Sequence, residues 1–223
     1  FNESIDRRTS MVSTSGLTYS NLFGNDHDLE VSGLFEHLTN KIKTFGYTGY
    51  GLDPRLPQTP AGVGDPSTYT PLLSGRRTRN AMSSFIGLLR YTYQNKYTLN
   101  ASYRYDGSST LPESNRWHGF YSVGASWEAK REQFFENVDA ISNLRIRASY
   151  GTTASPFPSD FAYLPTYGLV GYGGQTGTAP TSPGNPFYDW EYAKEMNIGF
   201  DLGVIQNRVR LTMEFYNRIT SNL

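Results

Sequence analysis

The side chains that could carry catalytic or metal-binding chemistry are few and scattered in this 223-residue sequence. Its three histidines, His27, His37 and His118, do not share the spacing of metal ligands, and the chain has no cysteine. The string at residues 26–28, Asp-His-Asp, has the residue types of a metal site, but it follows a glycine and an asparagine and lacks third and fourth ligands. We interpret it as a polar turn and predict neither a metal nor a cofactor.

Nucleophilic and acid–base catalysis are no better supported. Serines are abundant, but none lies in a Gly-x-Ser-x-Gly elbow. The carboxylate pair of a glycoside hydrolase is defined by its separation in space, and nothing in the sequence favours one pair over another. The string at residues 106–109, Asp-Gly-Ser-Ser, has the form of an anion-binding loop, yet Asp-Gly primarily indicates a turn. We predict that the chain is not an enzyme.

The composition excludes several other classes. Lysine plus arginine and aspartate plus glutamate both number 20, so no net field attracts nucleic acid or anionic lipid. No apolar run approaches the roughly 18 residues of a membrane-spanning helix, which excludes a helical membrane protein. Aromatic residues nevertheless make up 15% of a chain whose mean hydropathy is −0.52, an unusual combination for a packed soluble core.

The elements that must position these side chains are β-strands. Apolar and polar residues alternate with a period of two, as in Tyr103 and Tyr105 against Arg104 and Asp106. The clearest stretches are 97–106, 118–128, 143–150, 195–202 and 209–216, and weaker ones are 9–20, 28–38 and 81–93. We predict an all-β fold of eight antiparallel, up-and-down strands.

The connections between these stretches fall into two alternating sets. The shorter set comprises residues 21–27, 94–96, 129–141 and 203–207, and the longer set comprises 39–80, 107–117 and 151–190. In an up-and-down sheet, alternate connections lie at opposite ends, and outer-membrane β-barrels combine short periplasmic turns with long extracellular loops. Within 129–141, Phe134, Val138 and Ile141 follow helical spacing, so we expect one short amphipathic turn helix there.

The two strand faces indicate the same class of protein. One face is rich in tyrosine with one tryptophan, as in a lipid-facing wall, and the other carries charged side chains suited to a wet lumen. We expect the charged residues to bond to one another or to a plug; they include Arg104, Arg145, Arg147, Glu195, Asp201, Arg210 and Glu214. The alternative is a soluble all-β carbohydrate-binding module, whose apolar faces would meet in a closed interior.

The long connection 151–190 is the predicted place of ligand or partner contact. Aromatic faces stack on sugar rings and on peptide side chains, and loops on a rigid scaffold often carry recognition. The candidate residues are Phe157, Phe161, Tyr163, Tyr167, Tyr172, Phe187, Tyr188 and Trp190. The other reading is that these aromatics only pack the loop. In the connection 39–80, Arg76, Arg77 and Arg79 face either lipid A or the lumen, and the sequence does not decide between the two.

Several strings, taken in order, resemble one protein family. They are residues 104–109 (RYDGSS), 120–127 (FYSVGASW), 132–135 (EQFF), 141–151 (ISNLRIRASYG) and 197–201 (NIGFD). Together they resemble the SusC/RagA family of TonB-dependent outer-membrane transporters of Bacteroidota, densely over residues 80–220 and loosely before them. No single string decides the resemblance; the order and spacing do.

The resemblance implies a 22-stranded transmembrane barrel with an N-terminal plug moved by the TonB complex. It also implies a SusD-type surface lipoprotein as a lid, outer-membrane lipid around the wall, and oligosaccharides or oligopeptides as cargo. Residues 1–223 would supply about eight strands of the barrel domain, without the plug and the remaining strands. Because the chain opens at Phe1 and stops directly after a strand-like run, we expect it to be an internal piece of a longer protein. Whether that parent forms a homodimer stays open.

Overall fold

The computed structural model describes residues 1–55, 59, 62, 67–68, 70–156, 160 and 162–221. Ten strands lie within these residues, and eight of them form one sheet in the order β1-β2-β3-β4-β5-β6-β9-β10. The remaining two, β7 and β8, form a separate hairpin. The pairs from β3 to β10 are antiparallel, and each strand of the large sheet neighbours the next one along the chain, apart from the inserted hairpin.

All eight predicted strands are present, but the first three are longer than the alternation indicated. The bounds are β1 Asn2–Phe23, β2 His27–Thr48, β3 Leu72–Tyr93, β4 Tyr97–Ser108, β5 Trp117–Glu128, β6 Ile141–Ser155, β7 Thr166–Tyr172, β8 Gln175–Ser182, β9 Glu191–Val204 and β10 Val209–Ser221. The predicted connection 39–80 therefore shrinks to residues 49–71. The apolar–polar signal fails in the added segments because lysine and arginine take positions that apolar residues take elsewhere on β2 and β3.

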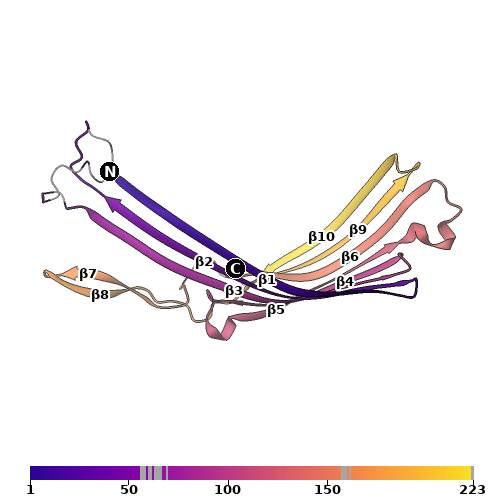
Figure 1. The fold of residues 1–223 in the computed structure, drawn as a ribbon, viewed down its shortest axis with the longest axis horizontal. Helices are drawn as coiled ribbons and strands as arrows, with labels where there is room; N and C mark the ends of the chain where they lie inside the picture. The colour runs from indigo at the N-terminus through magenta and orange to yellow at the C-terminus, as the bar shows by residue number, and fades with distance from the viewer. Residues whose placement is uncertain are drawn as a thin grey trace. The chain divides into compact units, whose positions relative to one another are not determined.

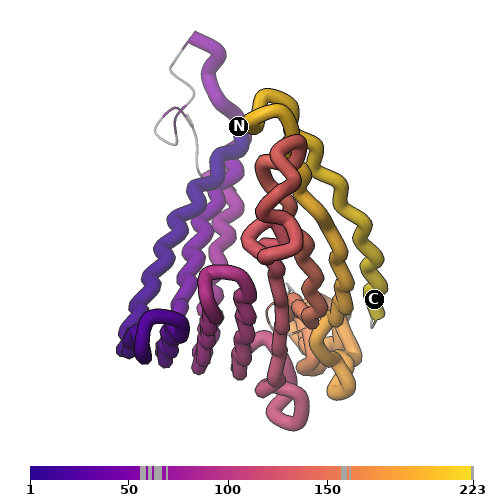
Figure 2. Tube along the Cα trace, turned by 90° about the vertical axis from the view of Figure 1, so that its right-hand side faces the viewer, coloured from indigo at the N-terminus to yellow at the C-terminus, as the bar shows by residue number. Residues whose placement is uncertain are grey.

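The chain divides into two compact units, which we describe separately. One comprises residues 1–12 and 38–81, and holds the first half of β1, the second half of β2, the first half of β3 and the 49–71 connection. The other comprises residues 13–37 and 82–223. In this second unit the turns 24–26, 94–96, 129–140 and 205–208 gather at one end, and the 109–116 and 156–190 connections lie toward the other (Figure 1). Strands β4, β5, β6, β9 and β10 follow one another across it (Figure 2).

In the second unit, the register of neighbouring strands places apolar residues beside apolar residues on one face and polar residues beside polar residues on the other. Tyr103 lies opposite Tyr121 on one face, and on the other face Ser102 lies opposite Ser122, with their hydroxyls 2.7 Å apart. No layer of the described residues covers the apolar face: Tyr103 is 54% exposed, Tyr121 48% and Phe215 62%. A soluble sandwich would bury these rings, so the single sheet contradicts the carbohydrate-binding alternative and confirms the predicted wall.

The expected amphipathic helix at 129–141 is wrong. Two single turns of 3-10 helix stand there instead, η3 Ala129–Arg131 and η4 Gln133–Phe135. Glu132 separates them with an extended backbone, and its carboxylate is directed to side chains of the sheet. Lys130 donates from Nζ to the carbonyl oxygens of Phe135 and Val138, at 2.8 and 2.9 Å. These side-chain bonds, together with backbone bonds that each run from an N–H to the carbonyl three residues earlier, take the place of the α-helical bonds that the apolar spacing predicted.

Candidate functional site

A cluster around Arg104 links three strands on the polar face. The guanidinium of Arg104 on β4 donates to both carboxylate oxygens of Asp106 at 2.7 Å, to the Ser84 hydroxyl of β3 at 2.9 Å, and to Glu36 of β2 at 3.3 Å. Asp106 and Ser84 are buried. Because a guanidinium presents several donors in a fixed plane, one arginine can hold three neighbouring strands at a fixed spacing.

A second cluster, around Arg147, repeats this arrangement on β6, β9 and β10. Arg147 lies 2.7 Å from Glu214 on β10 and donates to Asp201 on β9 at 3.3 Å, and Thr212 donates to Asp201 at 2.9 Å. Arg145 pairs with Glu128 next to it. The predicted pairing of charged residues is therefore confirmed for Arg104, Arg145, Arg147, Asp201 and Glu214. Arg210 and Glu195 form no ion pair within the part of the chain that the structure describes.

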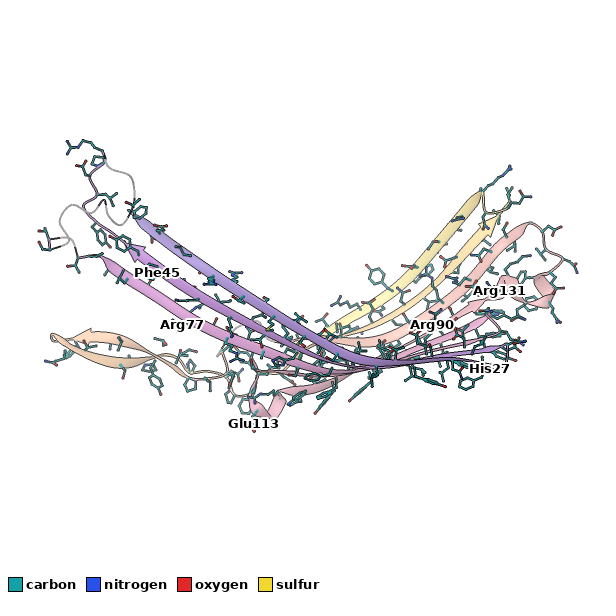
Figure 3. All side chains as sticks on the ribbon, viewed as in Figure 1. His27, Phe45, Arg77, Arg90, Glu113 and Arg131 are labelled. Atoms are coloured by element: carbon teal, nitrogen blue, oxygen red, sulfur yellow. The ribbon has the colours of Figure 1, made fainter. Side chains whose placement is uncertain are left out.

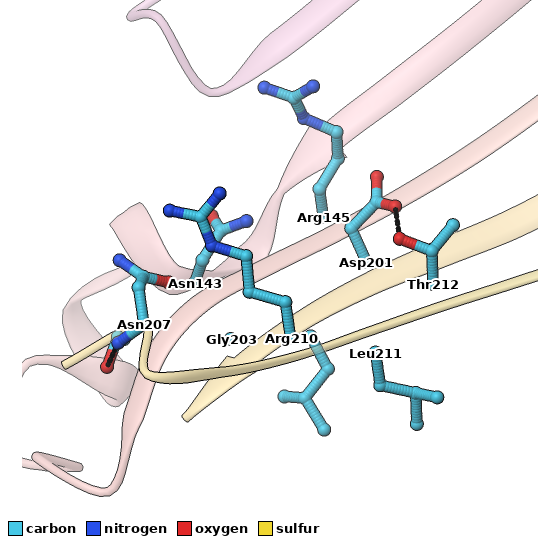
Figure 4. A pocket seen from close by; sticks show the side chains of 10 residues that line it. Asn143, Arg145, Asp201, Gly203, Asn207, Arg210, Leu211 and Thr212 are labelled. Carbon is cyan, nitrogen blue, oxygen red and sulfur yellow. Dashed lines mark hydrogen bonds between the residues drawn. The ribbon is translucent and has the colours of Figure 1, made fainter. Parts of the chain in front are cut away.

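A polar groove lies beside the turn between β9 and β10. Arg145, Arg210, Asn143 and Asn207 supply donors to it, and Asp201 supplies an acceptor (Figure 4). The turn is unusual because Ile205, Gln206 and Asn207 all have positive φ, between 53 and 61°. A β-branched residue rarely takes this conformation. The groove has the chemistry to receive a carboxylate or another anion from outside the chain.

The exposed apolar face carries aromatic rings near both strand ends. Toward one end, Tyr105 stacks on Trp117 with ring centroids 5.3 Å apart, and Phe35 contacts Phe85 at 5.2 Å. Toward the other, Tyr93 stacks on Tyr97. The eight steps from Tyr97 to Tyr105 span about 26 Å along the strand. At a tilt of about 40° this gives a height of about 20 Å, close to the apolar band between the aromatic girdles of an outer-membrane barrel.

Glu132 binds the turn 129–140 to the aromatic side chains at that second end. Its carboxylate accepts from the hydroxyl of Tyr97, from Trp127 Nε1 at 3.1 Å and from Lys96 Nζ at 3.1 Å. The hydrogen bonds from Tyr97 and then Trp127 lower the pKa of the Glu132 carboxyl below its ordinary value. The turn is therefore held by a carboxylate that stays ionised.

The 156–190 connection carries the hairpin β7–β8, which the sequence analysis did not predict. Its two-residue turn is Gly173-Gly174, with φ of 57 and 76°, and this pair of glycines between two alternating stretches was the available signal. The hairpin displays large side chains: Tyr172 is 90% exposed, Leu169 78% and Tyr167 67%. Tyr167 and Leu169 lie on one face of the hairpin and Tyr172 lies on the other, so the hairpin exposes large apolar or aromatic side chains on both faces.

The base of the same connection is anchored in a small core. Trp190 is 1% exposed, lies edge-on to Phe120 at 5.5 Å and donates from Nε1 to the carbonyl of Asn115 at 2.9 Å. The Asn115 side chain donates back to the carbonyl of Tyr188 at 2.9 Å. Leu111 completes this core. Sequence reasoning missed Leu111, Asn115 and Phe120, because no local pattern connects them to a segment about 75 residues away.

The structure therefore separates the predicted contact residues into three groups. Tyr167, Tyr172 and Phe187 are exposed, Tyr163 and Tyr188 are half-buried, and Trp190 is buried. Phe157 and Phe161 lie outside the described residues. Asp26, His27 and Asp28 do not form a metal cluster: the His27 ring bonds to the Tyr91 hydroxyl at 2.7 Å, and no group of three potential ligands occurs among the described residues.

No helix in the described part of the chain is long and apolar enough to cross a bilayer.

Comparisons with known proteins agree with this geometry. The family model described as "TonB dependent receptor-like, beta-barrel" matches residues 2–223. The TonB-dependent receptor SusC of Bacteroides thetaiotaomicron is 29% identical over 212 residues, which are 91% of this chain and 20% of SusC. The TonB-dependent receptor P39 of Formosa agariphila is 32% identical over 148 residues, 66% of this chain and 14% of P39.

The fold matches a solved structure of the RagAB peptide transporter with a TM-score of 0.88 at 24% identity, covering 98% of this chain and 24% of that one. The chain thus spans about a fifth of the curated relatives it matches. The family match covers nearly every residue of the chain. The antiparallel strands, the exposed aromatic face and the arginine-bridged polar face agree with it. The chain belongs to the TonB-dependent receptor β-barrel family, as a SusC/RagA-type segment of an outer-membrane protein.

Proposed function

We propose that the chain forms part of the wall of an importer that carries bulky nutrients, oligosaccharides or oligopeptides, across the outer membrane. The importer works with a SusD-type lipoprotein as its lid, and a plug outside this chain is moved by the TonB complex. The wall performs no covalent chemistry. Because the chain spans only about a fifth of its curated relatives, this activity is proposed for the whole protein.

The observation that carries the proposal is the contrast between the two faces of one sheet. Arg104 and Arg147 each join three neighbouring strands on the polar face, whereas Tyr103, Tyr121 and Phe215 stay exposed on the other. A stiff, wet inner face suits a lumen wide enough for bulky cargo. The RagAB peptide transporter shares the fold, which supports peptides as one of the two cargo classes.

The hairpin β7–β8 is the proposed place of contact with cargo or with the lid. Tyr167 and Tyr172 present their rings on a two-stranded scaffold that is itself tied down at Trp190. Exposed tyrosines on a rigid element contribute contact area at a small cost in entropy. Phe187, also exposed, lies between the hairpin and the anchor.

The test uses the full-length receptor in cells that carry its lipoprotein partner. Labelled oligopeptides and oligosaccharides are supplied separately, and uptake is measured with and without a protonophore. We expect one class to be taken up, in an energy-dependent manner. The double variant Tyr167→Ala/Tyr172→Ala should lower uptake or lipoprotein co-purification about tenfold or more, as for hot-spot aromatics.

The matched control is Phe134→Ala, which removes an exposed aromatic from the turn at the other end of the unit and should change neither measurement. Uptake that survives the protonophore unchanged, or that is absent for both cargo classes, would refute the importer. Equal behaviour of the hairpin and control variants would refute the contact role alone.

A further inference from the structure

Strands β5 and β6 separate before either of them ends. Their pairing stops at Ser122 on β5 and Gly151 on β6. Beyond these residues β5 still pairs with β4 as far as Trp117, and β6 still pairs with β9 as far as Ser155. Both strands therefore stay extended, although no register pair in the described part of the chain joins them there. The sheet contains a split between two intact strands.

The strand edges along this split carry backbone groups without a strand partner. At the base of the split, the Tyr121 N–H donates to the Thr152 hydroxyl at 3.1 Å, and this hydroxyl donates to the Tyr121 carbonyl at 3.4 Å. The backbone groups of Tyr121 therefore point toward β6, and by alternation so do those of Gly119. The antiparallel register directs the backbone groups of Thr152 and Ala154 toward β5. Among the described residues, no backbone bond reaches Gly119 or Ala154 from this side.

A cleft of about 350 Å³ lies along the split, and we call it the β5–β6 cleft. Its volume is in the range of ligand pockets. Beyond it, the Tyr192 hydroxyl of β9 lies 3.0 Å from His118 Nδ1 of β5 and bridges the split. The residues of its lining that matter here are Ser102, Arg104, Asp106, Phe120, Ser122 and Trp190, with 152–154 of β6.

The cleft lies beside the 109–116 connection. The Asn115 carbonyl of this connection accepts from Trp190, which lines the cleft. Asn115 ends the single 3-10 turn η2, Glu113–Asn115, whose first residue is labelled in Figure 3. The open length of the split, from Tyr121 to His118, is about 10 Å at the rise of a strand. This length fits about three residues of an extended chain and is shorter than the five or six residues of an ordinary protein strand.

The lining favours a peptide over a sugar. The two charged side chains of the lining cancel, because Arg104 forms an ion pair with Asp106 at 2.7 Å. Phe120 is 6% exposed and Trp190 1%, so neither ring presents a face on which a sugar could stack. The groups that remain for a ligand are the donors and acceptors of two strand edges. Their alternation and fixed direction match the backbone of an extended polypeptide.

We propose that the β5–β6 cleft binds the main chain of an extended, uncharged oligopeptide as a short strand paired with the edge of β6. The proposal rests on the importer function proposed above and names peptides as the cargo class. Unpaired backbone groups are costly in a wall that has lipid on its other side, so a paired peptide stabilises this part of the sheet. The competing occupants are an oligosaccharide and a strand of the lipoprotein. The buried rings disfavour the first, and the short open length disfavours the second.

The experiment measures binding of a fluorescent hexapeptide of alanine and threonine, blocked at both ends, to the full-length receptor in detergent by anisotropy. Ser122→Trp fills the cleft from an exposed position and should weaken binding about tenfold or more, the loss of about two backbone hydrogen bonds. The matched control is Ser149→Trp, which is exposed on the same face of the sheet, outside the cleft, and should leave binding unchanged.

A second variant tests the backbone edge directly. Ala154→Pro removes an N–H that points into the split and keeps the N–H groups that pair with β9, so it should weaken binding about fivefold or more. The thermal unfolding midpoint of each variant is measured beside binding, so that loss of the fold is recognised. The same hexapeptide N-methylated at all its amides has no backbone donors and should bind about tenfold more weakly to wild type. Maltohexaose should not displace the hexapeptide.

Four results would overturn the proposal. They are an absence of hexapeptide binding to wild type, equal binding of the methylated and unmethylated peptides, equal effects of the two tryptophan variants, and displacement of the hexapeptide by maltohexaose. If Ser122→Trp keeps the peptide but loses a co-purifying lipoprotein, the cleft belongs to the lipoprotein and the proposal also fails. Energy-dependent uptake of oligosaccharides would still support the importer in each case, so the two failures are distinguishable.

Discussion

Replacing Trp190 by alanine should free the 156–190 connection from the sheet while leaving the wall intact. Trp190 is 1% exposed, packs against Phe120 and Leu111, and donates its indole N–H to Asn115. Truncating a buried aromatic of this size costs about 3–5 kcal/mol, of which the hydrogen bond accounts for about 1 kcal/mol. Because the core lies at one end of the unit, this cost falls on local opening of the connection rather than on global unfolding.

The assay is protease cleavage of the connection in intact cells that display the full-length receptor. If cleavage follows the open population, a loss of about 3 kcal/mol raises its rate about a hundredfold or more. Trp190→Phe keeps most of the ring volume and should raise the rate only about fivefold. Phe187→Ala, in the same connection but 83% exposed, should have little effect. If Trp190→Ala and Phe187→Ala are cleaved at the same rate, the anchoring role of the small core is wrong.

Three further outcomes follow from single residues. Gly184 has φ of 71° and a Cβ there would lie 2.5 Å from backbone, so Gly184→Ala should open the same connection by about 1–3 kcal/mol, whereas Gly177→Ala, whose Cβ would meet Val170 only at an ordinary contact distance of 3.9 Å, should not. Ile205 has φ of 53°, so Ile205→Gly should stabilise the receptor by about 1 kcal/mol in urea unfolding; a lower midpoint would contradict the strain. Hydrogen bonding lowers the pKa of Glu132 in the folded state, so its contribution is present above the unfolded value of about 4.3 and is lost as pH falls through the folded pKa. Fluorescence of Trp127 should change in that acidic window, and Glu132→Gln should abolish this change.

The sequence alone determined the class of fold and the two faces of its wall. Period-two alternation is a local property of a strand, so the sequences of residues 97–106 and 118–128 already showed which side chains share a face. The alternation of short and long connections was also present in the chain order. The apolar–polar alternation of the strands failed on parts of β2 and β3, because lysine and arginine at 41, 43, 77 and 79 conceal the continuation of these strands from a search for apolar periodicity.

Only the tertiary structure decided which charges meet and what holds the loops. Arg104 of β4 reaches past β3 to Glu36 of β2, 68 positions away in the sequence, and Trp190 bonds to Asn115 of a connection 75 positions away, because the fold brings distant parts of the chain together. The helix expected at 129–141 gave way to the bonds of Glu132 and Lys130, which no local pattern contains. The register of β3 on β2 also decided on which face of the sheet Arg77 and Arg79 lie, since a shift of one residue exchanges the two faces of a strand.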